Sequence, residues 1–316
     1  MKTKFISLLF LVVFTASCRP PTLPTPGENA QLIMNFDDTD TNTLVWSPVS
    51  DFLVLTQTYL NNGYSKIYLI NAKEMTSQLL IETQPHDGTI EANAWSPDGS
   101  QILFTSNFGT YKPGIWVMNV FDRSLPSYVI DGEYPSWSAD GQIAFRKIVL
   151  GQGTSINLVD GNFQKIDFTD ETEEDPFELE WKEIYSSEQN IYYSTWSPDG
   201  HVLAFGIDDR DGRYDEDLFL LDIVTGSLDQ VTFSGGNTLP SWSPTSNLIV
   251  FVNYSEQNLP LSLNILDVDT LCTVRIPEIT YAEDPTWSPD GTKVAFTSFG
   301  GVYLVELAKI LGEDSC

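Results

Sequence analysis

The chain has 316 residues, of which 41% are apolar, 12% are aromatic and only 19% are charged. This composition is typical of a folded globular protein and excludes a disordered chain. The formal net charge is −28 at pH 7. Such a surface repels phosphate groups, so we expect no nucleic-acid partner.

The first residues have the layout of a secretory signal. Lys2 and Lys4 precede an apolar run at 5–14 that is too short to cross a bilayer. The sequence TASC at 15–18 resembles the bacterial lipobox, in which the cysteine is lipidated and becomes the new N-terminus, although Thr15 replaces the usual aliphatic residue. We therefore predict a lipoprotein signal peptide at 1–17 and lipidation of Cys18. The alternative is a plain signal peptide that contains a cysteine.

A proline-rich segment follows the predicted lipidation site. Its four prolines, among polar residues, predict an extended tether at 18–30. No later segment is apolar enough to cross a membrane. Residues 31–316 are therefore expected to form one folded domain.

The dipeptide Trp-Ser recurs six times, at intervals of 42 to 59 residues. The copies read WSPVSD, WSPDGS, WSADGQ, WSPDGH, WSPTSN and WSPDGT, and each precedes an apolar strand such as ILFTS or VAFTS. Pro-Asp-Gly between two apolar runs favours a tight hairpin turn, because proline presets φ and glycine accepts positive φ. Repeats of about 45 residues made of short strands predict the blades of a β-propeller.

Counting strands predicts how the ring closes. If the Trp-Ser strand is innermost, the sixth copy ends after its third strand, and residues 31–36 form a strand that belongs to no repeat. We predict an all-β, six-bladed propeller in which residues 31–36 complete the outer edge of blade six. This closure also removes an exposed strand edge.

The repeats resemble the WD-repeat-like propeller motif of the TolB family over residues 31–307. Blades one, three and five depart from the motif at Val49, Ala139 and Thr245-Ser246. The resemblance implies a propeller that works through contacts with an envelope protein or a polysaccharide. The chain has no G-x-S-x-G elbow of a propeller-bearing hydrolase.

The residue types offer little for catalysis. The chain has only two histidines, His86 and His201, so a histidine metal site or a Ser-His-Asp triad is hard to assemble. The acidic loop at 208–217 resembles a calcium loop in part, but Ile207 stands where the motif needs an acidic residue. We expect no cofactor, no metal and no catalytic residues.

We expect one face of the ring to bind the partner. We call it the upper face; it lies opposite the turns that follow each Trp-Ser. It should carry the acidic insertion at 170–183, which we place after the outer strand of blade three, and the loop at 208–217. The position four residues before each blade tryptophan should line the mouth of the central channel there, at Asn42, Glu91, Glu133, Tyr192, Thr238 and Glu283. Further predicted contact residues are Trp181, Tyr185, Tyr193, Asp208, Asp209, Asp211, Tyr214, Asp215 and Asp217.

These features predict a monomeric, non-catalytic binding or scaffold module, anchored to the bacterial cell envelope only by the lipid on Cys18. One alternative is a carbohydrate-active enzyme that uses carboxylates facing the channel. Another is a passive structural lipoprotein. For an exported protein with two further cysteines, we also predict a disulfide between Cys272 and Cys316.

Overall fold

The computed structural model describes residues 27, 29–36, 41–86, 88–107, 114–122, 124–149, 153–161, 179–208, 216–254, 261–277 and 279–309. The predictions for Cys18, Cys316 and the segments 1–26 and 162–178 lie outside these residues. Within the described part, one short 3-10 helix at Leu307–Lys309 accompanies 24 strands, and no helix could cross a membrane.

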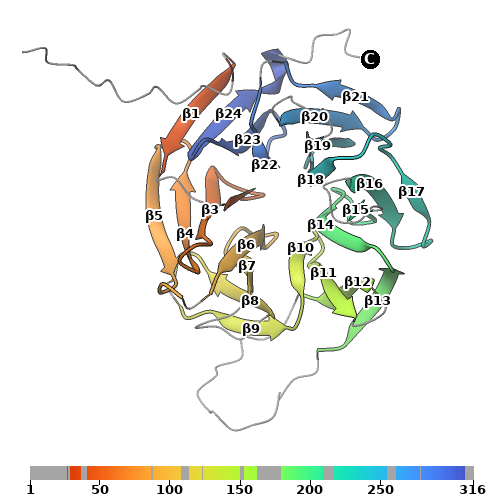
Figure 1. Cartoon of the computed structure of the whole chain (residues 1–316), viewed down its shortest axis with the longest axis horizontal. Helices are drawn as coiled ribbons and strands as arrows, with labels where there is room; N and C mark the ends of the chain where they lie inside the picture. Colours follow the sequence, from red (N-terminus) through yellow and green to blue (C-terminus); the bar gives the residue numbers. More distant parts are fainter. Residues whose placement is uncertain are drawn as a thin grey trace, which may run out of the picture.

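The strands form six four-stranded antiparallel sheets arranged as the blades of a ring (Figure 1). Blade one contains β2 (Thr41–Trp46), β3 (Phe52–Tyr59), β4 (Tyr64–Asn71) and β5 (Thr76–Glu82). Blade two contains β6 (Ile90–Trp95), β7 (Gln101–Ser106), β8 (Gly114–Asn119) and β9 (Ser127–Ile130). Blade three contains β10 (Glu133–Trp137), β11 (Gln142–Val149), β12 (Gly153–Asp160) and β13 (Trp181–Ser187).

Blade four contains β14 (Asn190–Trp196), β15 (Val202–Asp208), β16 (Glu216–Asp222) and β17 (Leu228–Gln230). Blade five contains β18 (Asn237–Trp242), β19 (Leu248–Asn253), β20 (Ser262–Asp267) and β21 (Cys272–Arg275). Blade six contains β22 (Glu283–Trp287), β23 (Lys293–Ser298), β24 (Gly301–Glu306) and β1 (Ala30–Asn35). Each Trp-Ser strand is innermost, so the predicted six-bladed propeller is confirmed.

The first strand closes the ring as predicted. β1 pairs antiparallel with β24, with Ala30 opposite Val305 and Asn35 opposite Gly301, and the red strand β1 and the blue strand β24 lie side by side in Figure 1. The innermost strand β22 ends at the lower turn, and its neighbours β23 and β24 are antiparallel in succession, so β24 also runs toward the lower face. β1 therefore runs upward, and Ala30 lies at the lower end of the blade.

The serine after each blade tryptophan organises the lower turns. In blade two, Ser96 Oγ donates to Asp98 Oδ1 at 2.6 Å and accepts from the Gln101 backbone N at 2.9 Å. Blade one lacks this aspartate, and there the Ser50 hydroxyl donates to Ser47 Oγ at 2.9 Å. Blade five does the same with Ser246 and Ser243 at 2.9 Å. Blades one and five thus keep the turn by a different hydrogen bond. Blade three departs only at Ala139 and keeps the hydrogen bond that Ser138 Oγ donates to Asp140.

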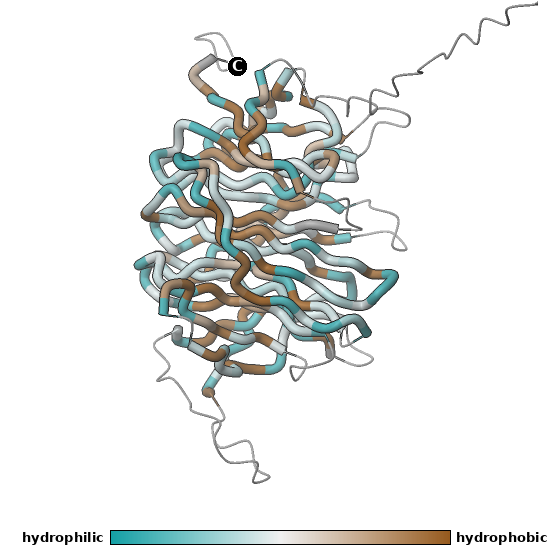
Figure 2. The backbone as a smooth tube through the Cα atoms, turned by 90° about the vertical axis from the view of Figure 1, so that its left-hand side faces the viewer, coloured by the Kyte–Doolittle hydropathy of each residue, from teal (hydrophilic) through white to brown (hydrophobic). Residues whose placement is uncertain are grey.

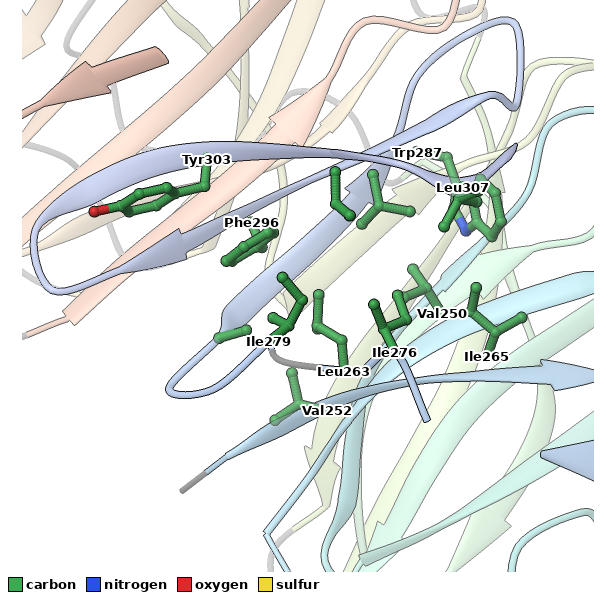
Figure 3. Close-up of a cluster of buried hydrophobic side chains, with 13 residues drawn as sticks. Val250, Val252, Leu263, Ile265, Ile276, Ile279, Trp287, Phe296, Tyr303 and Leu307 are labelled. Atoms are coloured by element: carbon green, nitrogen blue, oxygen red, sulfur yellow. The ribbon is translucent and has the colours of Figure 1, made fainter. Parts of the chain in front are cut away.

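The hydrophobic core is divided among the six interfaces between neighbouring blades. Apolar colours in Figure 2 follow the strands inside the ring, whereas the ends of the blades are more hydrophilic. Figure 3 shows one cluster, in which Phe296 and Tyr303 of blade six face Val252 and Leu263 of blade five. The second strand of blades two to six contributes a phenylalanine that is at most 2% exposed, at 104, 145, 205, 251 and 296. Burying such large side chains stabilises each interface.

The lower turns also associate in pairs. A Cβ added to Gly99 would lie 2.5 Å from Val49 Cγ2 of the preceding blade, and one added to Gly291 would lie 2.1 Å from Thr245 Oγ1. A Cβ added to Gly200 would lie 3.5 Å from Asp140 Oδ1, which is an ordinary van der Waals contact. These contacts join blades one and two, three and four, and five and six. Val49 and Thr245 stand in turns that lack the full Pro-Asp-Gly motif. Their side chains therefore fill space left by a glycine in the next blade.

One topological prediction is wrong. The insertion that includes residues 170–183 does not follow the outer strand of blade three, because that outer strand is β13, which begins at Trp181 and pairs with β12. A connection between third and fourth strands leaves a blade at its lower end. Trp181 pairs with Val159 near the end of β12 and thus lies toward the lower face. The Lys147 ammonium, which comes from β11, lies 4.4 Å from the centre of its ring.

Candidate functional site: the upper mouth of the channel

A cavity of about 520 Å³ follows the ring axis and is lined by the inner strands of all six blades. Its lower part is formed by the six blade tryptophans and by the prolines of the turns, including Pro48, Pro97, Pro198, Pro244 and Pro289. Its upper part is lined by Thr43, Glu91, Asn93, Tyr134, Tyr193, Leu239 and Asp284. Polar and aromatic groups therefore gather at the upper end.

Bulges in the inner strands decide which side chains face this cavity. In blades three to six the register shifts just before the tryptophan. The residue three positions before the tryptophan has a left-handed backbone in each case, with φ of 48° at Tyr134, 44° at Tyr193, 53° at Leu239 and 49° at Asp284. A bulge inserts one extra residue and redirects the neighbouring side chains. The third position, not the fourth, thus lines the cavity in these blades.

The predicted lining at the fourth position needs correction for this reason. Glu91 does line the cavity, because the register of blade two shifts one residue later, between Ala92 and Ala94. The cavity lining does not include Glu133, Tyr192, Thr238 or Glu283. The side chain of Asn42 lies outside the described part of the structure.

Two carboxyl groups face the cavity and carry raised pKa values. Burial, followed by the charge of Glu133, raises the pKa of Glu91 to about 7, against a weak opposing hydrogen bond that Asn93 Nδ2 donates at 3.4 Å. Burial and the charges of Glu283 and Glu91 raise the pKa of Asp284 well above its usual range. No lysine or arginine of the described residues contributes to either shift. Among the residues that the structure describes, the two groups therefore have no cationic counterpart.

An arginine stands beside these acids, on the second strand of blade three. Arg146 Nε donates to Glu133 Oε2 at 3.2 Å, its Nη2 forms an ion pair with the same oxygen, and its Nη1 donates to the Ile191 backbone oxygen at 2.9 Å. The guanidinium carbon lies 4.6 Å from the centre of the Tyr134 ring and 5.2 Å from that of Tyr192. The Arg146 side chain is only 11% exposed. It is held by a carboxylate, a carbonyl and two aromatic rings at once.

Sequence reasoning missed Arg146, although a signal was present. The corresponding strand of blade three reads IAFRK, whereas the other copies have ILFTS, LAFGI, IVFVN and VAFTS, with no charge at the position after phenylalanine. Because the other copies carry no charge at this position, a cation there indicates that this strand does more than form the blade.

Three tyrosines form a contiguous aromatic group at the mouth. The ring centre of Tyr134 lies 4.8 Å from that of Tyr193 and 6.4 Å from that of Tyr192. Burial, and then the charge of Glu91, raises the pKa of Tyr134 to about 12, and burial also raises the pKa of Tyr193. These phenols are neutral at physiological pH and present aromatic surface next to the two carboxyls.

The base of the 208–217 loop lies at the upper end of blade four. Asp208 and Glu216 face each other across β15 and β16, and both are buried. Asp217 accepts hydrogen bonds from Thr232 Oγ1 at 2.8 Å, the Gly235 backbone N at 3.2 Å and Asn237 Nδ2 at 2.9 Å. Asp217 therefore holds the connection to blade five in place. The predicted contact residues Asp209, Asp211, Tyr214 and Asp215 lie outside the described residues.

Glu216 is the most unusual carboxyl of this region. It is 8% exposed, and its Oε2 has no hydrogen-bond partner among the residues that the structure describes. Burial raises its pKa to about 7, with a smaller contribution from the charge of Asp208 and an opposing hydrogen bond to Thr238.

A second cavity, of about 490 Å³, adjoins blades two and three at the upper face. It is lined by Ser106, Asn107, Gly114, Asp131, Gly132, Glu133, Arg146, Lys147 and Ile148. The ion pair of Glu133 and Arg146 therefore borders this cavity as well as the tyrosines of the channel mouth. Both histidines are exposed, and no group of three or more potential metal ligands occurs in the described ranges.

No family model matches the sequence, and no curated protein matches it. The structure is similar to that of TolB from Acinetobacter baumannii, with 18% identity and a TM-score of 0.55 over 84% of this chain and 63% of that one. It is also similar to a protein described as TolB from Agrobacterium tumefaciens (17% identity, TM-score 0.61, 84% of this chain and 89% of that one). An oligogalacturonate lyase in complex with manganese is similar at 14% identity, with a TM-score of 0.53 over 90% of this chain and 80% of that one. The fold is thus a TolB-like six-bladed β-propeller, and this chain spans less than two thirds of the Acinetobacter protein.

Proposed function

We propose that this propeller is a non-catalytic binding or scaffold module that engages a protein or polysaccharide partner through its upper face. The observation that carries the proposal is the convergence of two tyrosines, Tyr134 and Tyr193, and two carboxyls on one cavity mouth. Tyr192 and the Arg146 guanidinium, which is paired with Glu133, pack against the Tyr134 ring. Aromatic rings and a few convergent polar groups in a concave site are typical of binding surfaces. This feature argues against a passive structural lipoprotein.

The proposed location is outside the cytoplasm, with the lipid on Cys18 as the only membrane anchor. It is supported by the charged and apolar start of the chain and by the TASC sequence. The upward direction of β1 places Ala30 at the lower end, so a tether from Cys18 approaches below and leaves the upper face free. Labelled palmitate should enter the wild-type chain and not a Cys18→Ser variant; equal labelling of both would contradict the anchor.

A carbohydrate-active enzyme is the second candidate. It is favoured by the pKa of about 7 of Glu91 in a cavity and by the fold that this protein shares with a lyase. An acid and base pair works best when one pKa is raised and the other is low. Here the pKa values of both Glu91 and Asp284 are raised. We therefore rank binding above catalysis.

The test is capture of partners from the protein's own envelope fraction with the domain that follows Cys18, with proteins and glycans both identified. Tyr192→Ala and Glu91→Gln on the upper face should each weaken capture at least tenfold. Val224→Ala, an exposed residue of a lower-face loop, is the matched control and should have no effect. Loss of capture with the control alone would place the binding surface on the lower face. Glycan turnover that Glu91→Gln abolishes would favour the enzyme.

A further inference from the structure

Among the described residues, no lysine or arginine lines the channel cavity beside the two carboxyls of its mouth. Glu91 and Asp284 face the same cavity, and the charge of Glu91 acts on Asp284, yet their only described donors are the amide of Asn93 and the hydroxyl of Thr297, each at 3.4 Å. Bringing two carboxylates together on one cavity wall is unfavourable unless a cation compensates them. The nearby Arg146 does not serve this purpose, because its donors are directed to Glu133 and to the Ile191 carbonyl.

The aromatic walls supply independent support for a cation. A positive charge is attracted to the face of a tyrosine ring within about 6 Å of its centre. The protein already uses this attraction at the same mouth, since the Arg146 guanidinium lies 4.6 Å from the Tyr134 ring and 5.2 Å from the Tyr192 ring. The Tyr193 ring, 4.8 Å from Tyr134, also lines the cavity.

We propose that the upper end of the channel binds one alkylammonium or guanidinium group of a protein partner, with Glu91 and Asp284 as its counter-ions and Tyr134 and Tyr193 as its walls. The proposal rests on the proposed function of the upper face and specifies its ligand. The long unbranched stem of lysine or arginine allows the charge to reach these carboxyls while the partner's backbone remains outside the channel. The net charge of −28 favours the approach of such a basic segment.

The experiment uses small probes, so it does not depend on isolating the partner. Binding of Nα-acetyl-lysine methylamide and of Nα-acetyl-arginine methylamide to the domain is measured by NMR titration. The Nε-acetylated lysine probe is the uncharged control, and glucosamine tests an amino sugar as the source of the ammonium. Asp284→Asn suits the left-handed backbone, because asparagine tolerates positive φ. Thermal melting verifies that each variant is folded.

The charged probes should bind the wild-type domain, and the combined Glu91→Gln and Asp284→Asn substitution should weaken them at least tenfold. Glu188→Gln removes an exposed upper-face acid and should change affinity less than twofold. The site is disproved if no charged probe binds, if the acetylated probe binds equally well, or if the double variant retains full affinity. Tighter binding of glucosamine would overturn the assignment to a protein partner. If the probes fail while Tyr192→Ala still abolishes partner capture, this inference falls and the proposed function stands.

Discussion

The indole Nε1 of Trp287 donates a hydrogen bond to the backbone oxygen of Ser241, 2.9 Å away in the preceding blade. Trp95 and Trp196 make the same bond, to Val45 at 3.0 Å and to Ser136 at 3.3 Å. Trp46 and Trp137 instead bond within their own turns, to Ser50 at 3.0 Å and to Gly141 at 3.3 Å. The indole therefore alternates between linking two blades and capping one hairpin.

We predict that this alternation is measurable in stability. Trp287→Phe removes the donor to Ser241, whereas Trp242→Phe removes an indole N–H that has no partner among the described residues. A lost buried hydrogen bond costs about 1 to 2 kcal/mol. Trp287→Phe should therefore lower the free energy of unfolding in urea by about that much more than Trp242→Phe. Equal losses would show that the indole bond does not hold the blades together.

The close packing of Gly291 against Thr245 gives a second testable prediction. Gly291 has a φ of 68°, so alanine there is strained, and its Cβ would also collide with Thr245 Oγ1. Gly226 has a φ of 75° but open space around it, so Gly226→Ala is the matched control and should cost about 1 to 2 kcal/mol. Gly291→Ala should cost at least about 1 kcal/mol more. Adding Thr245→Ala should remove this excess; a double variant no better than Gly291→Ala alone would refute the paired contact.

Replacing Arg146 should loosen the junction of blades three and four. Arg146→Met leaves the Glu133 carboxylate and the Ile191 carbonyl without their donor, which should cost about 1 to 3 kcal/mol of unfolding free energy. Lys147→Met, one residue further, removes only a cation near the Trp181 ring and should cost less than about 1 kcal/mol. Similar denaturation midpoints for the two variants would contradict this role for Arg146.

Because Glu216 is buried, we predict that the free energy of unfolding falls as pH rises. Its pKa in the folded protein is about 7, against an ordinary value of 4.5. Between these values the folded state keeps a proton that the unfolded state has lost. The unfolding free energy therefore decreases through this window, by roughly 3 kcal/mol once pH exceeds 7.

Glu216→Gln is neutral at every pH and should remove the share of this decrease that Glu216 contributes, roughly 3 kcal/mol, whereas the shares of Glu91 and Asp284, whose pKa values are also raised, remain. The variant should resemble the wild type at pH 4 and be the more stable protein at pH 8, as measured by urea denaturation across this range. Glu188→Gln, at an exposed site, should leave the profile unchanged. Parallel profiles for Glu216→Gln and the wild type would show that the Glu216 carboxyl ionises freely in the folded state.

Cys272 is disulfide-bonded, and we predict Cys316 as its partner. The bond should add roughly 4 kcal/mol by restricting the unfolded chain. Cys316→Ser should expose a titratable thiol at Cys272 and lower stability accordingly, whereas Cys18→Ser should do neither. A thiol that appears only with Cys18→Ser would reassign the bond.

The sequence predicts the ring better than the site, for physical reasons. Trp-Ser and Pro-Asp-Gly mark local turns, so blade number and the closing strand follow from counting. The bulges do not, since Tyr134, Tyr193 and Leu239 are not residue types that signal a left-handed backbone as glycine does. The outer strand β13 was also missed, because its mostly polar sequence WKEIYSS is largely solvent-exposed and lacks a clear apolar alternation.

The pairing of β1 with β24 also affects the order in which the strands can pair during folding. Ala30 and Val305 are neighbours in blade six although nearly the whole folded chain separates them. During synthesis or export from the N-terminus, β1 emerges first and must wait for the last strand before it can be paired. Joining such distant segments is entropically costly and slow. The open ring is therefore a stage that every newly made molecule passes through, with an unpaired β24 edge that a chaperone or a second chain could meet before β1 does.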